Sequence, residues 1–200
     1  MNAKSLSPRA KALPADERRA AIIEAALQLI AAQGSAVTTR QIAQHAGIAE
    51  GTIFRVFPDK ESLINAAVET AFDPAGLSIQ LETIDPSLGL RDRLTATVEI
   101  LARRVDQLFQ LITALNLNRS EIKSQAMQAR FESEVAAIAR VIEPDAALLR
   151  HEPLVAAQIL RGLTFAGTHP LFALGHPLTV AEIVTVALEG LKLSKDTPCY

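Results

Sequence analysis

The sequence predicts an all-α protein, and three observations support this class. Of its 200 residues, 49% are hydrophobic, yet only 4% are aromatic and none is Trp. The apolar residues are mostly Ala, Leu and Ile, of which Ala and Leu are strong helix formers. They recur at every third or fourth position over long stretches, and short segments with Gly or Pro separate those stretches. We therefore expect helices packed on helices.

Residues 38–57 show the pattern of two short helices joined by a tight turn. The hydroxyl of Thr38 can cap the first helix, while Gln41, three residues later, reaches back to complete a capping box. That helix is expected to end at Gly47, because glycine adopts the left-handed backbone that turns the chain. The second helix, over 50–56, has one apolar face for the core and one free face. This pattern is typical of a helix-turn-helix.

A helix-turn-helix inserts the N-terminal part of its second helix into the major groove of DNA. Small residues there permit close approach, and polar side chains reach base edges and phosphates. The residues that occupy this part of the helix are Glu50, Gly51, Thr52 and Arg55. Singly, each is an ordinary surface residue of any helical protein, so the prediction of DNA binding rests on the set.

Further residues around this motif match a known pattern over residues 16–72. They are the run Arg19 to Ala26, Gly34, Thr39, Ile42-Ala43, Ala46-Gly47, Gly51-Thr52, Phe57 and Lys60, all in register. With these residues the chain resembles the tetracycline-repressor (TetR) family of bacterial transcription regulators. The agreement of many positions at fixed spacing makes the resemblance specific. It implies a DNA-binding domain over 16–72 and a helical effector-binding and dimerisation domain over 73–200.

Three positions depart from the pattern of that family. Ala49 stands where relatives often have a serine that caps the recognition helix, and loss of such a cap costs about 1 kcal/mol. Phe54 replaces a tyrosine whose hydroxyl touches a phosphate in relatives, and Val56 replaces a common histidine. The ring of Phe54 stays at the DNA interface that the resemblance implies. The remaining polar contacts are then expected from Thr39, Arg40, Thr52, Arg55 and Lys60.

Basic charge concentrates near the N-terminus. Residues 1–60 hold eight Lys and Arg against five Asp and Glu, although the whole chain has a net charge of −2. Residues 1–15 have no apolar period, so we expect a flexible basic arm that either contacts the minor groove or serves as a solubilising tail. They also lack the apolar segment of a signal peptide, which predicts a cytoplasmic protein. Because the uncharged stretch 162–181 contains two prolines, we expect no membrane span.

Beyond residue 72, periodicity outlines the second domain. Turn residues break the chain at 73–76 and 85–89, and a long helix follows. Its apolar stripe consists of Leu94, Val98, Leu101, Val105, Leu108 and Ile112. Further helices are expected over 120–142, from 153 towards 169, and from 179. The last one opens on a Thr179 and Glu182 capping box and carries the stripe Val180, Ile183, Val184, Ala187, Leu188 and Leu191.

The simplest cover for that last stripe is a second copy of the chain, with the last two helices of each subunit forming a four-helix bundle. The alternative is that these helices close the core of their own subunit, and periodicity does not separate the two. A homodimer suits DNA binding, because two recognition helices about 34 Å apart match successive major grooves of a palindromic operator. The resemblance also implies a dimer.

The resemblance implies a small-molecule site among the middle helices. Apolar side chains that are candidates to line it are Phe109, Met127, Phe131 and Phe165, although core packing explains each of them as well. Polar contacts to an effector are expected from Arg103, Asn116, His151, Arg161, Thr164 and His169. Because the chain has no Trp and one Tyr, an apolar or weakly polar effector is favoured over a flat cation.

The same sequence argues against an enzyme or a metal-binding protein and leaves one alternative class open. An enzyme would need a nucleophile, a base and an orienting group, and the four His residues occur without a phosphate-binding loop or a nucleophile elbow. We therefore predict no catalytic residues and no cofactor. His169 and His176 lack Cys or carboxylate partners at metal-site spacing, so no metal site is expected. The alternative to a ligand-responsive homodimeric repressor is a helical interaction module that binds no DNA.

Overall fold

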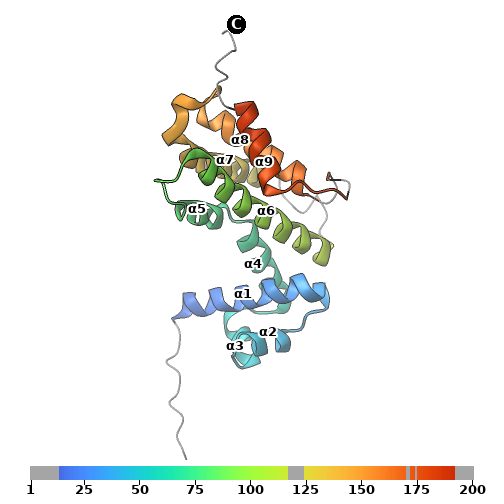
Figure 1. The fold of residues 1–200 in the computed structure, drawn as a ribbon. Coiled ribbons are helices and arrows are strands. Elements are labelled where there is room, and N and C mark those ends of the chain that lie inside the picture. The colour runs from blue at the N-terminus through green and yellow to red at the C-terminus, as the bar shows by residue number, and fades with distance from the viewer. Residues whose placement is uncertain (1–13, 117–123, 170–171, 174, 192–200) are drawn as a thin grey trace, which may run out of the picture. The chain divides into compact units, whose positions relative to one another are not determined.

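The computed structural model describes residues 14–116, 124–169, 172–173 and 175–191, with the backbone alone for 124–129. Over these residues the chain forms nine α-helices and two short 3-10 helices and no strand, which confirms the predicted all-α class (Figure 1). Its contacts divide it into two compact units, residues 1–70 and 71–200. The predicted arm over 1–15 lies almost entirely outside the described residues.

The first unit is a small bundle of short helices. Its elements are α1 (Ala15–Gln33), the 3-10 turn η1 (Gly34–Ala36), α2 (Thr39–His45), α3 (Glu50–Val56) and most of α4 (Lys60–Phe72). The side chains that fill its core are fully buried, among them Ile22, Ile30, Ile42, Ile53 and Leu63. The capping box of Thr38 and Gln41 is formed at the start of α2. Gly47 makes the turn after α2 with a φ of 66°, in the left-handed region that glycine adopts without strain.

The second unit contains the longer helices. Its elements are α5 (Pro74–Glu82), α6 (Leu90–Leu115), α7 (Ser124–Ile142), the 3-10 segment η2 (Glu143–Leu148), α8 (Pro153–Thr168) and α9 (Val180–Leu191). Helix α8 packs against α6, α7 and α9, and α5 packs against α6 and α7 (Figure 1). Of the stripe predicted on α6, the first three residues are buried and the last three are half-buried. The core of this unit is therefore shared by five helices.

The segment between residues 73 and 89 contains a helix, α5, that was not predicted, because its turn residues indicate breaks in the chain. Asp73 does end α4, but its carboxylate also accepts a hydrogen bond from the backbone N–H of Ala75 at 2.9 Å and caps α5. Pro74 then occupies the first turn of α5, where its missing N–H is harmless. A Pro residue after an Asp cap thus both stops one helix and starts the next.

Helix α9 buries its apolar stripe within its own chain. Its capping box is present, because Thr179 and Glu182 exchange hydrogen bonds of 2.8 and 3.2 Å. Ile183, Val184 and Leu191 are at most 2% exposed, and α9 packs on α6 and α8 of the same subunit. The expectation that a second copy covers this stripe is therefore wrong; the alternative, closure of the subunit's own core, is what the structure has.

None of the helices in the described part of the chain combines the length and the apolar character that a membrane crossing requires.

Candidate DNA interface and effector site

Helix α3 is held by its apolar side and leaves the other side free. Ile53 is fully buried and Phe57 is 2% exposed. The guanidinium carbon of Arg19 lies 4.6 Å from the centre of the Phe57 ring, which fixes the end of α3 against α1. In the turn, the N–H of Ile48 donates to the carbonyl of Ala43 at 2.9 Å. These contacts fix the orientation of the outward face of α3.

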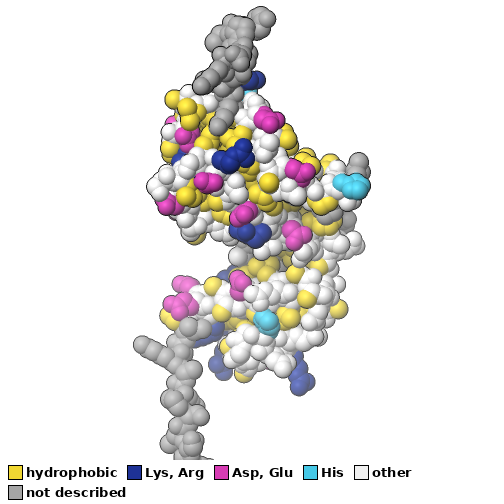
Figure 2. Space-filling model, viewed as in Figure 1, with side chains coloured by type: hydrophobic (Ala, Val, Ile, Leu, Met, Phe, Trp, Pro, Cys, Tyr) yellow, Lys and Arg dark blue, Asp and Glu magenta, His cyan; other side chains and the backbone are white. Residues whose placement is uncertain are grey.

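The outward face combines two cations, a glycine and an exposed ring. Arg40 on α2 and Arg55 on α3 are exposed, and no ion pair joins either of them to another described residue. Figure 2 shows Lys and Arg side chains projecting from the end of this unit that carries α2 and α3. Gly51 is exposed with nothing within 4 Å of where a Cβ would lie, and Phe54 is 50% exposed. Such a surface permits close approach of a polyanion.

Four of the residues predicted to contact DNA, Thr39, Glu50, Thr52 and Lys60, are held or partly covered within the chain. The hydroxyl of Thr39 donates to Oε1 of Glu50 at 2.6 Å and joins α2 to α3. The ammonium of Lys60 donates to the carbonyl of Ser35 at 2.7 Å, which links α4 to the turn after α1. Thr52 is half-buried. The partner of Lys60 lies 25 residues away in sequence, so no local pattern could have indicated it.

The N-caps of α3 and α4 differ. Ala49 is the N-cap of α3 and supplies no side-chain hydrogen bond. In contrast, the carboxylate of Asp59 accepts from the backbone N–H of Ser62 at 2.7 Å at the start of α4. That hydrogen bond lowers the pKa of Asp59, because it stabilises the charged form. The recognition helix is thus the less well capped of the two.

In the helical unit, three of the predicted effector residues come together. The Phe109 ring of α6 lies edge-on to the ring of His169, with 4.8 Å between the centroids. Phe165 of α8 lies at the same centroid distance from His169. A fourth ring, Phe172, was not predicted, and its centroid is 5.2 Å from that of His169. No helical period connects Phe172 to the others, because it follows α8.

Two further predicted residues, Phe131 and Arg161, meet at a charged cluster. The guanidinium carbon of Arg161 lies 4.1 Å from the centre of the Phe131 ring, and its Nε donates to Glu134 at 3.0 Å. The other oxygen of Glu134 lies 3.4 Å from Nε of Arg104. Glu134 is 9% exposed. Neither Glu134 nor Arg104 was predicted, since both resemble ordinary surface charges until α6, α7 and α8 pack together.

Among the other predicted effector residues, Arg103, Asn116, His151 and Thr164 form no ring contact or ion pair with the described residues of these clusters. Arg103 and His151 are exposed. Asn116 is the C-cap of α6, with a left-handed φ of 51°. Thr164 is buried, and its hydroxyl donates to the carbonyl of Leu160 in its own helix at 2.8 Å. The side chain of Met127 lies outside the described residues.

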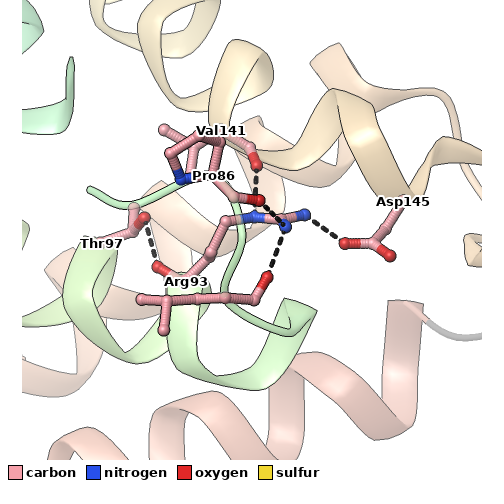
Figure 3. Close-up of polar contacts among 6 residues, drawn as sticks. Pro86, Arg93, Thr97, Val141 and Asp145 are labelled. Atoms are coloured by element: carbon pink, nitrogen blue, oxygen red, sulfur yellow. Dashed lines mark hydrogen bonds and ion pairs between the residues drawn. The ribbon is translucent and has the colours of Figure 1, made fainter. Parts of the chain in front are cut away.

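A separate cavity of about 320 Å³ contains none of the predicted effector residues. Its lining consists of Ser78, Leu81, Glu82, Ile84, Pro86, Arg93, Ala137, Arg140, Val141 and Pro144. Arg93 forms one wall and is fixed by the carbonyls of Pro86, Leu88 and Val141 and by the carboxylate of Asp145 (Figure 3). Each of its three nitrogens donates within the fold, so Arg93 stabilises this region.

No group of three or more His, Cys, Asp or Glu side chains among the described residues is placed to hold a metal ion.

The first unit matches a known family, and the whole chain resembles solved structures in fold. Residues 22–67 match the family model described as bacterial regulatory proteins, tetR family. A TetR-family protein from Mesorhizobium loti is 20% identical, with a TM-score of 0.59 over 91% of this chain and 100% of that one. A TetR-family protein from Vibrio parahaemolyticus is 17% identical, with a TM-score of 0.58 over 88% and 100%. SmeT, the repressor of the Stenotrophomonas maltophilia multidrug efflux pump SmeDEF, is 18% identical, with a TM-score of 0.52 over 88% and 91%. At these identities, the structural similarity shows the shared fold.

Proposed function

We propose that the chain is a member of the tetR family of bacterial regulatory proteins, whose model residues 22–67 match, and that it is a sequence-specific DNA-binding repressor. It binds a palindromic operator as a homodimer and is released by a small apolar or weakly polar effector. The observation that carries the proposal is the outward face of α3, where Gly51, Phe54 and Arg55 are exposed on a helix whose other side is buried. Arg40 and Arg55 supply phosphate contacts, and the small and ring-bearing residues approach the bases.

A homodimer is supported by an exposed apolar stripe on α8. Val155, Ile159 and Phe165 are 40–43% exposed, and Gly162 lies between them with open space around its Cβ position. They recur at intervals of three or four residues, so they lie along one face of the helix. A continuous apolar face of this kind marks an interaction surface. The dimer is therefore proposed through this face of α8, together with exposed Val186 of α9, and not through the buried stripe of α9.

An effector that binds beside the rings around His169 and the ion pairs of Glu134 can act on α4 through Arg104. Besides approaching Glu134, Arg104 donates from Nη2 to the carbonyl of Asp73 at 2.9 Å. Asp73 directly follows the last residue of α4, which is one continuous helix starting at Lys60 in the DNA-binding unit. A ligand that binds one conformation of this region more tightly than another would, through the contact of Arg104 with Asp73, shift the equilibrium position of α4. The proposed release from the operator is this change.

The test is selection of duplexes from a random DNA pool by the full-length protein, followed by affinity measurements at several salt concentrations. We expect an enriched palindrome and a steep loss of affinity with salt. Arg55→Ala should weaken binding to all duplexes and reduce the slope of log K against log salt by about 1 for each phosphate that the variant no longer neutralises. Arg91→Ala, an exposed arginine of α6, is the matched control and should change neither.

The homodimer and the effector switch are tested with the same full-length protein. Ile159→Asp should shift the dimer towards monomer in sedimentation and weaken operator binding in parallel. If no duplex is enriched at low salt, the chain is instead a helical interaction module. If compounds that bind the second unit leave operator affinity unchanged at saturation, the effector switch is wrong even where DNA binding is intact.

A further inference from the structure

Phe54 is the one large apolar side chain that is prominently exposed among residues 14–70 of the structure. It is 50% exposed, whereas its neighbour Ile53 is fully buried and Phe57 is 2% exposed. No other aromatic ring and no guanidinium group of the described residues stacks on it. The helix therefore presents a bare phenyl ring to its surroundings.

The surroundings of this ring indicate what covers it. Arg55 follows directly, and Arg40 of α2 is exposed in the same unit. The half-buried carboxylate of Glu50, one turn before Phe54, accepts from the hydroxyl of Thr39, so the exposed charges here are mainly cationic. Gly51, one turn before Phe54, is exposed and leaves open space where a Cβ would lie. An apolar protein partner would leave these cations uncompensated, whereas a nucleic acid supplies phosphates for them and a groove for the ring. Charge complementarity thus favours DNA as the occupant.

A phenyl ring can read one feature of the major groove. It has no hydrogen-bond donor or acceptor, so it cannot read the amino groups, ring nitrogens or carbonyls of the bases. The C5-methyl group of thymine is the apolar group that the groove presents, and Phe is among the side chains that contact it. We infer that Phe54 packs on the C5-methyl group of a thymine in each half of the operator and so determines sequence specificity. This inference rests on the proposed function.

The experiment replaces thymine by deoxyuridine, which lacks only that methyl group. Starting from the enriched palindrome, each symmetric pair of thymines is substituted in turn, and the dissociation constants of wild type and Phe54→Ala are measured at one salt concentration. A buried methyl group contributes about 0.8 kcal/mol, which is about fourfold in affinity. We expect one symmetric pair at which wild type loses about fourfold per half-site, whereas Phe54→Ala loses nothing further.

Matched variants separate this role from general effects. Phe54→Tyr keeps the ring and should keep the loss on deoxyuridine substitution. Arg55→Ala should weaken binding to every duplex and also keep that loss, because it removes a charge and not the ring. Since Phe54 is half-exposed, the alanine variant should fold, and its helical circular dichroism should equal that of wild type.

Two results would overturn the inference, and they are distinguishable. If deoxyuridine costs wild type and Phe54→Ala the same at every position, Phe54 does not read the methyl group, and a uniform loss by Phe54→Ala would place the ring on the sugar. That outcome leaves the proposed function standing. If the random pool gives no enriched duplex, the proposed function fails and this inference fails with it.

Discussion

Two arginines of the DNA-binding unit and three of the helical unit have opposite roles. In the DNA-binding unit, Arg40 and Arg55 are exposed and form no ion pair with a described residue. In the helical unit, the side chain of Arg93 is 5% exposed and forms an ion pair with Asp145. Arg104 and Arg161 there share the carboxylate of Glu134. Arg40 and Arg55 therefore keep their charge available for a partner, whereas Arg93, Arg104 and Arg161 join helices.

The two units also differ in how far apart in sequence their polar partners lie. In the first unit, Thr39 and Glu50 are 11 residues apart and the Lys60 contact spans 25. In the second unit, the pair of Arg93 and Asp145 spans 52 residues. Long-range pairs form only when the whole unit is folded, so their loss should affect the entire unit rather than one helix.

The largest expected effect breaks the buried arginine contact. Arg93→Ala removes one partner of a buried ion pair and leaves Asp145 and three carbonyls without their donor. Breaking such a pair typically costs about 3–5 kcal/mol, so the free energy of unfolding should fall by about that amount. Urea-induced unfolding at one protein concentration measures it.

The exposed arginines provide the matched comparison for this prediction. Arg55→Ala and Arg91→Ala change exposed side chains, and each should alter the free energy of unfolding by less than about 0.5 kcal/mol. Arg93→Ala should therefore unfold at a clearly lower urea concentration than the other two variants. Equal stabilities for all three variants would show that the distinction between available and structural arginines is wrong.

Substitutions at two helix N-caps of the first unit should change the free energy of unfolding by smaller amounts and in opposite directions. Ala49, the N-cap of α3, has extended backbone angles of −74° and 142° and no side-chain cap. Ala49→Ser supplies an acceptor for a free N–H of α3 and should raise the free energy of unfolding by about 1 kcal/mol. Thr38→Ala removes the capping box of α2 and should lower it by a similar amount. Thermal unfolding of the two variants should give midpoint shifts of opposite sign; a shift of the same sign would contradict this account.

The contrast between near and distant partners also explains what the sequence could predict. The helix-turn-helix follows from short-range signals: the capping box at Thr38, the turn at Gly47 and the buried positions of Ile53 and Phe57. Each signal acts within about four residues, so it is present in the sequence itself. The effector candidates Phe109, Phe165 and His169 could be named by type, and the structure brings them together. That they bind a ligand stays a prediction.

Three other features could not be predicted from signals that act within about four residues. Helix α5 was not predicted, because Asp73 and Pro74 mark the end of one helix and also the start of the next. Glu134 and Arg104 are charges that only three packed helices bring into contact. The stripe of α9 showed that an apolar face needs a cover, but periodicity cannot tell whether the cover is the same chain or a second one. Long-range packing decides these questions, and a local pattern does not contain it.

The smallest expected effect concerns a feature that the two units share. Asp59 in the first unit and Glu182 in the second are exposed carboxylates that accept hydrogen bonds near a helix start, from Ser62 and Thr179 respectively. Those hydrogen bonds lower both pKa values. A lowered pKa in the folded state contributes stability above the ordinary carboxyl pKa, and this contribution is lost as the pH falls through the folded value. The stability difference between wild type and Glu182→Gln should therefore be present at neutral pH and shrink below roughly pH 4. Asp59→Asn should behave alike, and carboxyl carbon NMR titrations should place both groups below the ordinary values of their types. If the pKa of Glu182 is lowered and that of Asp59 is not, the hydrogen bond from Ser62 does not stabilise the charged form of Asp59, and the prediction fails for the first unit.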